Sequence, residues 1–115
     1  MEIELIETLK ETDNQIIVFK VAESCNLWRF VLLVFNETGS KSQIPVFSYV
    51  FESVDVAAGD FVVIHSESGN YTVGKNKVNT NSHSFYVGEK LFNEPMNSYL
   101  VVLIKAGEVQ KYLSR

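Results

Sequence analysis

The two histidines, His65 and His83, are the residues whose chemistry is easiest to imagine, and they lie at opposite ends of a long polar stretch, Ser66–Ser84. If this stretch closes as a loop, the two imidazoles could meet. A Zn²⁺ site would need at least one further ligand. The carboxylates nearby in sequence are Asp60, Glu67 and Glu89. The chain has no His-x-x-x-His pair and no second cysteine, so we expect no metal and no other cofactor.

A Ser–His–acid triad can also be assembled from Ser66 or Ser84, either histidine, and Asp60. Almost any chain of this length offers such a set. The Gly-x-Ser-x-Gly motif of a nucleophile elbow is absent, and Gly69 and Gly74 flank no Lys-Ser or Lys-Thr as the glycines of a phosphate-binding loop do. The plainer interpretation is that both histidines hydrogen-bond at strand ends.

Contact with a partner is the other use of these side chains, and the candidates are Trp28, Tyr71, His65 and His83. Trp28 stands beside Arg29 at a junction between a turn and a strand, where we expect it to be partly exposed. Tyr71 is one of the few large apolar residues in the Ser66–Ser84 stretch. Tyr and Trp join an apolar ring to a polar group, which suits them to interfaces.

Composition limits the classes of function. A chain of 115 residues fits one domain, 1–115, with a core of its own. The net charge is −4 and the basic residues are scattered, so the basic surface that nucleic-acid binding needs is not expected. No apolar run approaches the ~18 residues of a membrane helix. The single cysteine, Cys25, and the acidic start of the chain favour a cytoplasmic protein.

The elements that must position these residues are organised around Ala57–Ser66. Gly59 lies in an Ala-Gly-Asp turn, and Phe61–Ile64 is a short apolar run. Such a run, bounded by turn residues, is typical of a strand buried on both faces. We therefore expect Val63→Asp to prevent folding.

Other short segments alternate or are rich in β-branched and aromatic residues, as strands are. They are Ile3–Leu9 at a sheet edge, Gln15–Val21, Arg29–Phe35 as a central strand, Val46–Glu52, Tyr99–Lys105 and Val109–Leu113. Phe47, Tyr49 and Phe51 share one face and are expected in the core. Asn36–Ser42 and Asn93–Ser98 are expected as a loop and a turn. This pattern predicts an all-β protein, an immunoglobulin-like β-sandwich of roughly seven to nine strands, with a small β-barrel as the alternative.

The Ser66–Ser84 stretch has two interpretations. A polar loop of this length is often functional, and we expect it to be the main contact surface. Alternatively it is a hairpin with Tyr71–Val73 as a short strand. In the first case, deleting residues 70–78 would leave the melting temperature nearly unchanged and abolish partner binding.

The second half of the chain resembles the lamin-tail domain, an immunoglobulin-like sandwich. Val54–Ile64 is similar to its hydrophobic–small–Gly–acidic–strand segment, and Leu91–Asn93, Tyr99–Leu103 and Gly107–Val109 are similar to its aromatic-Asn turn, next strand and closing hairpin. Phe92 stands where the family usually has Trp, and Asn26–Arg29 lacks the family's Gly. The resemblance implies a β-sandwich used for binding or scaffolding, with no catalytic residues.

The sequence thus predicts a non-enzymatic interaction or scaffolding module whose partner is a protein, not nucleic acid and not a membrane. One alternative is a structural subunit of a larger assembly, such as a phage or envelope component, paired through the edge strands Ile3–Leu9 or Val109–Leu113. The other is a metal-dependent hydrolase that uses His65 and His83.

Overall fold

The computed structural model describes residues 2–11, 13–36, 45–92 and 99–105. These residues form ten β-strands and one 3₁₀ helix, and the strands group into sheets of five, three and two. The all-β class is therefore confirmed, and the described strands do not close into a barrel. The ten strands exceed the predicted seven to nine because the short segments Cys25–Asn26, Asp55–Val56 and Thr72–Lys75 also form strands. Within the described residues, no helix is long and apolar enough to span a membrane.

The chain divides into two compact units, which are described one at a time. The first contains residues 1–25 and 56–91, and the second contains residues 26–55 and 92–115. β3 (Cys25–Asn26) and β6 (Asp55–Val56) form the two-stranded sheet.

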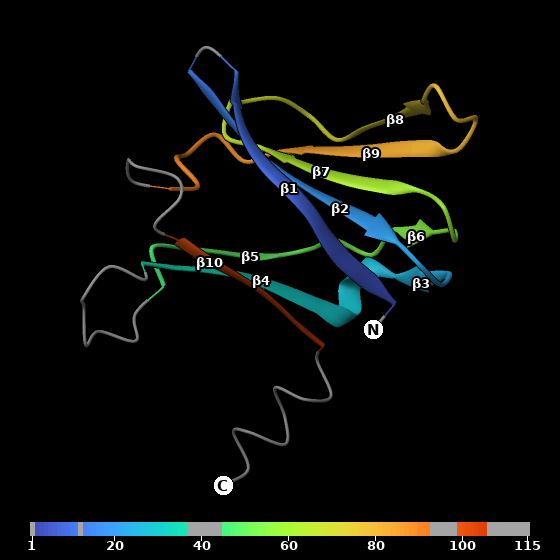
Figure 1. Cartoon of the computed structure of the whole chain (residues 1–115), viewed down its shortest axis with the longest axis horizontal. Coiled ribbons are helices and arrows are strands. Elements are labelled where there is room, and N and C mark those ends of the chain that lie inside the picture. Colours follow the sequence, from blue (N-terminus) through green and yellow to red (C-terminus); the bar gives the residue numbers. More distant parts are fainter. Residues whose placement is uncertain (1, 12, 37–44, 93–98, 106–115) are drawn as a thin grey trace, which may run out of the picture. The chain divides into compact units, whose positions relative to one another are not determined.

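The first unit is built on the five-stranded sheet, in the order β1-β2-β7-β9-β8 (Figure 1). The strands are β1 (Ile3–Glu11), β2 (Asn14–Val21), β7 (Phe61–His65), β8 (Thr72–Lys75) and β9 (Asn81–Tyr86). All neighbours are antiparallel except β7 and β9, which are parallel. The predicted edge strand at Ile3–Leu9 and its neighbour at Gln15–Val21 are confirmed.

One face of this sheet is buried at its three central strands, and the other face is half open. Val62 and Ile64 of β7 are buried, and so are their cross-strand neighbours in β2 and β9. Val63 points to the opposite face and is only half buried. The prediction that Phe61–Ile64 is buried on both faces is therefore wrong: β7 is central in its sheet, but alternation buries only one of its faces. A test of the core by substitution belongs at Val62 or Ile64, not at Val63.

The turn before β7 matches its sequence pattern. The Asp60 N–H donates to the Ala57 carbonyl over 3.0 Å, and Gly59 has φ +93°. This is the left-handed region, which an L side chain occupies only with strain. The Val21 N–H donates to the Asp60 carbonyl over 2.9 Å, and the Gly59 N–H donates to the Val21 carbonyl over 2.8 Å. The turn is thus anchored to the end of β2.

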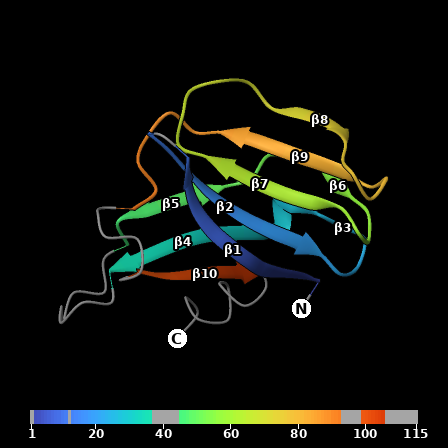
Figure 2. The same cartoon turned by 45° about the horizontal axis from the view of Figure 1, so that its top comes forward.

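The second unit contains the three-stranded sheet β10-β4-β5, whose members are β4 (Phe30–Asn36), β5 (Phe47–Val50) and β10 (Tyr99–Lys105). Figure 2 shows β4 between its two neighbours, as predicted for Arg29–Phe35. Phe47 and Phe51 are buried, so their assignment to the core is confirmed, whereas Tyr49 is half-buried and its ring contacts both of theirs. Val46 and Val50 face the other way and are exposed.

Several predictions concern segments that lie outside the described residues. They are the loop after Asn36, the turn at Asn93–Ser98, the closing hairpin at Gly107–Val109 and the edge strand at Val109–Leu113. These stay predictions.

Candidate functional site

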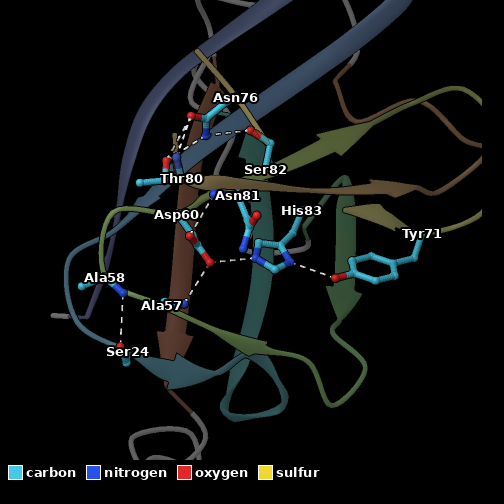
Figure 3. A network of polar contacts seen from close by, with 10 residues as sticks. All are labelled: Ser24, Ala57, Ala58, Asp60, Tyr71, Asn76, Thr80, Asn81, Ser82 and His83. Carbon is cyan, nitrogen blue, oxygen red and sulfur yellow. Dashed lines mark hydrogen bonds and ion pairs between the residues drawn. The ribbon is translucent and has the colours of Figure 1, made fainter. Parts of the chain in front are cut away.

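A row of three polar side chains crosses the first unit from the turn before β7 to the sheet edge. Figure 3 shows Asp60, His83 and Tyr71 pointing toward one another. Asp60 Oδ2 lies 2.9 Å from His83 Nε2, and His83 Nδ1 lies 2.8 Å from the Tyr71 hydroxyl. Asp60 and His83 are 4% and 5% exposed, whereas Tyr71 is 38% exposed. The row therefore leads from the interior to the surface.

Asp60 is held as a carboxylate by three donors. Its Oδ2 accepts from the Ala57 N–H (3.0 Å) and from His83, and its Oδ1 accepts from the Asn81 N–H (3.1 Å). Burial alone raises the pKa of Asp60, but these hydrogen bonds from Ala57, His83 and Asn81 outweigh it and lower the pKa below its ordinary value. The carboxylate therefore joins the turn before β7 to the first residue of β9.

The charge of Asp60 decides where the imidazole proton lies. An ionised carboxylate can only accept, so His83 carries its proton on Nε2. In the neutral ring Nδ1 is then an acceptor, and the Tyr71 hydroxyl donates to it. The chain of donors runs from Tyr71 through His83 to Asp60.

This order resembles a Ser–His–Asp triad with tyrosine in the position of the nucleophile. A nucleophilic phenol needs a lowered pKa or a proton transfer to its neighbour. Here burial, and after it the negative charge of Asp60, raise the pKa of Tyr71. The arrangement therefore keeps the hydroxyl protonated and donating, which suits positioning of the strand that carries it.

Of the triad that could be assembled from the sequence, only one pair is formed. The His83–Asp60 pair is present, but Ser84 follows His83 directly in β9 and so points to the opposite face. Ser66 belongs to a different cluster, where its hydroxyl accepts from the Gln15 N–H over 2.8 Å and donates to Asn14 Oδ1 over 3.2 Å.

His65 lies in that second cluster, on the half-open face. Its Nδ1 is 3.1 Å from Asn14 Nδ2, and its ring stacks on Tyr86 with centroids 4.4 Å apart. A Cβ added at Gly69 would come within 2.9 Å of the Tyr86 ring, so this glycine lets the chain pass close to the ring. These contacts tie the end of β7 to the start of β2 and the end of β9.

The two histidines do not meet. In the parallel register of β7 and β9, His83 pairs with Val62 and His65 pairs with Tyr86. Residues 62 and 65 differ by an odd number, so the two imidazoles project from opposite faces of the sheet. One ion cannot be shared by both rings in this arrangement, and in the part of the chain that the structure describes no group of three or more His, Cys, Asp or Glu could hold a metal.

The interpretation of Ser66–Ser84 as one long loop is wrong, and the hairpin alternative is the one found. Thr72–Lys75 forms β8, antiparallel to β9. Asn76 holds the turn between them: its Oδ1 accepts from the N–H groups of Val78 and Thr80, and its Nδ2 donates to the hydroxyls of Thr80 and Ser82. Asn79 completes the turn with φ +63°. The role of Asn76 in this turn was not predicted from the sequence, although Asn is a recognised turn residue.

Trp28, the fourth candidate, belongs to the second unit and is 64% exposed, as predicted. It lies in the 3₁₀ helix Leu27–Arg29, where the Trp28 N–H donates to Asn26 Oδ1 over 2.9 Å. Asn26 Nδ2 in turn donates to Ser53 and Asp55. The helix that presents the indole is thus well anchored, and its role in partner contact stays a prediction.

No family model, no curated protein and no solved structure matches the chain.

Proposed function

We propose that this protein is a non-enzymatic interaction module that binds an extended segment of a partner protein by strand addition at β8. The observation that carries the proposal is that all four residues of β8 are exposed and that, among the described strands, β8 pairs with β9 alone. An edge strand has a row of backbone N–H and C=O groups without sheet partners, and an extended peptide can pair with them.

The β8 edge is held in place before any partner arrives. At one end Tyr71 is hydrogen-bonded to His83, and its ring packs on Phe85 with centroids 4.9 Å apart. At the other end Asn76 organises the turn into β9. A strand ordered in advance loses less conformational entropy on binding, which favours affinity.

The side chains of β8 supply an apolar contact of limited size. Tyr71 and Val73 alternate onto one face and are 38% and 51% exposed, and Val78 in the turn is 68% exposed. In strand addition the backbone supplies much of the affinity and alternate side chains supply specificity. We infer that a preferred partner strand carries apolar residues on the face that meets Tyr71 and Val73.

The sandwich arrangement, the similarity to lamin-tail domains and a cytoplasmic location are part of this proposal. They are consistent with a β-rich binding module, and they add no catalytic residue. The expected partner remains a protein because the charge pattern offers no broad basic surface for nucleic acid.

The test is a selection of phage-displayed twelve-residue peptides against the intact chain, followed by NMR mapping of each selected peptide on ¹⁵N-labelled protein. We expect the largest amide shifts at residues 72–75. We also expect Val73→Lys to weaken binding at least about tenfold, a loss of about 1.4 kcal/mol. Val50→Lys is the matched control, because Val50 is a similarly exposed valine on β5. Binding that maps to other amides, or that both variants affect equally, would refute the proposal.

A further inference from the structure

We propose that the strand added at β8 is β1 of a second copy of this chain, so that the protein associates head to tail through the two edges of one sheet. This inference rests on the proposed function, because it names the partner of the β8 edge. It also involves β1, which is the opposite edge of the five-stranded sheet among the strands that the structure describes, since β1 and β8 are the first and last of them (Figure 2).

The strand directions permit this contact. Along the order β1-β2-β7-β9-β8, three of the four neighbouring pairs are antiparallel and one is parallel. Three reversals leave β8 antiparallel to β1. A second copy in the same orientation therefore brings its β1 against β8 as an antiparallel pair, the more stable type of ladder. The buried face of one sheet then continues as the same face of the next.

The side chains at the two edges also fit each other. One row of cross-strand neighbours runs through all five strands: Leu5, Phe19, Val62, His83 and Val73. Its three inner members are buried, while the two ends, Leu5 and Val73, are 44% and 51% exposed. Pairing Val73 with Leu5 of a second copy continues this row and removes apolar surface from water at both ends.

The charges of the two edges favour pairing β1 with β8 over pairing either edge with the same edge of a second copy. Glu4 and Glu7 flank Leu5 on β1 and are exposed, whereas Lys75 and Lys77 follow Val73 and are exposed. Since β1 carries Glu4, Glu7 and Glu11 against one lysine, Lys10, and β8 carries Lys75 with Lys77 beside it, two like edges would bring like net charges together, which is unfavourable. When Val73 faces Leu5, Glu4 faces Gly74 and Lys75 faces Ile3, so the Glu4 and Lys75 side chains project from opposite faces of the sheet and form no direct ion pair. The unlike pair is favoured only by the opposite net charges of the two edges.

The contact is short, and association is therefore weak. β8 has four residues. The register of β1 shifts between Leu5 and Glu7, which interrupts its edge. We expect a concentration-dependent equilibrium that weakens only modestly with salt, because the attraction between the two edges comes from their net charges and not from a direct ion pair.

Sedimentation velocity of the intact chain over a range of concentrations tests the inference. Leu5→Lys blocks the β1 edge and Val73→Lys blocks the β8 edge, and both sites are exposed, so both variants are expected to fold. We expect the wild type to form dimers and larger species, and each variant alone to remain monomeric. An equimolar mixture of the two variants should form a dimer and nothing larger, because each keeps the edge that the other lacks. Val50→Lys should associate like the wild type.

Three results would overturn the inference: a wild type that stays monomeric at about 1 mM, the weak end of specific binding, a single-edge variant that still associates, or a mixture of the two variants that forms no dimer. If any of these occurs while selected peptides still bind at residues 72–75, only the identity of the partner is wrong. If peptide binding fails as well, the proposed function is wrong.

Discussion

Replacing Asp60 by Asn is the sharpest test of the network behind the β8 edge. The carboxylate accepts from two backbone N–H groups, those of Ala57 and Asn81, and from His83 Nε2. An amide of the same shape has one acceptor and one donor. Whichever way it is turned, its NH₂ group faces one of the two backbone N–H groups.

The expected loss of unfolding free energy follows from the hydrogen bonds that the amide weakens or breaks. A hydrogen bond to a charged acceptor contributes about 1.5–3 kcal/mol, and one to a neutral acceptor about 0.5–1.5 kcal/mol, so each of two retained bonds loses about 1 kcal/mol. The backbone N–H that faces a donor costs about 1–3 kcal/mol more. We expect Asp60→Asn to lower the free energy of unfolding by about 3–5 kcal/mol at pH 7, a large share of the ~5–15 kcal/mol typical of a domain.

The second part of the test is how the stability loss caused by Asp60→Asn depends on pH. Hydrogen bonds from Ala57, His83 and Asn81 hold the pKa of Asp60 below its ordinary value of 3.8 despite burial. A lowered pKa contributes stability that is present above the unfolded-state pKa and is lost as the pH falls through the folded-state pKa. The difference in free energy of unfolding between the wild type and Asp60→Asn should therefore be largest near pH 7 and decrease below about pH 4.

Urea unfolding followed by tryptophan fluorescence and circular dichroism, at neutral and at acidic pH, measures both quantities. Asp13→Asn is the control, because Asp13 is exposed in the turn between β1 and β2. That change should alter stability by less than about 0.5 kcal/mol. A stability of Asp60→Asn within that margin of the wild type, or a loss independent of pH, would refute the account of the network.

The other predictions concern β7, the turn before it and the phenol at the edge. Ile64→Ala should cost about 2–5 kcal/mol in urea unfolding, and Val63→Ala about 1 kcal/mol, because only Ile64 is fully buried. Gly59→Ala should cost about 1–2 kcal/mol because φ is +93°, while Gly74→Ala should be neutral or slightly stabilising, since nothing lies within 4 Å of its new Cβ. Burial and the charge of Asp60 raise the pKa of Tyr71 above 10.0. The stability from its neutral hydroxyl should therefore persist below pH 10 and disappear as the pH rises through the raised pKa, with the ¹³Cζ signal of Tyr71 titrating later in the folded protein than in urea.

The strands that the sequence predicts are those whose own side chains determine them. β2 and β4 are rich in β-branched and aromatic residues, and β5 alternates between buried or half-buried positions and exposed ones. The turn at Gly59 could also be predicted from its own residues, because the glycine of Ala-Gly-Asp readily adopts the positive φ that the turn requires. In these segments local preference and tertiary structure agree.

β8 could not be predicted from its own residues in this way. Thr72–Lys75 is exposed at every position, so no buried face imposes an alternating pattern on it. Its order comes from partners that the sequence does not place beside it, namely β9, Asn76 and the Tyr71–His83 bond. The same limit applies to the histidines. Their separation depends on the parallel register of β7 and β9, and a shift of β9 by one residue would bring both rings onto the same face of the sheet.

The Asp60–His83–Tyr71 row is best understood as the means by which a short polar strand becomes an ordered edge. Four residues exposed on both faces gain little from burial, and a two-stranded hairpin alone is marginally stable. The row adds hydrogen bonds that run from the anchored turn at Asp60, through β9, to the residue just before β8. Because its inner members are buried and fully paired, bending or shifting β8 would leave a buried polar group without a partner, which is more costly than the bond itself is favourable. The network therefore makes β8 ordered yet open to pairing, which is the property that strand addition requires.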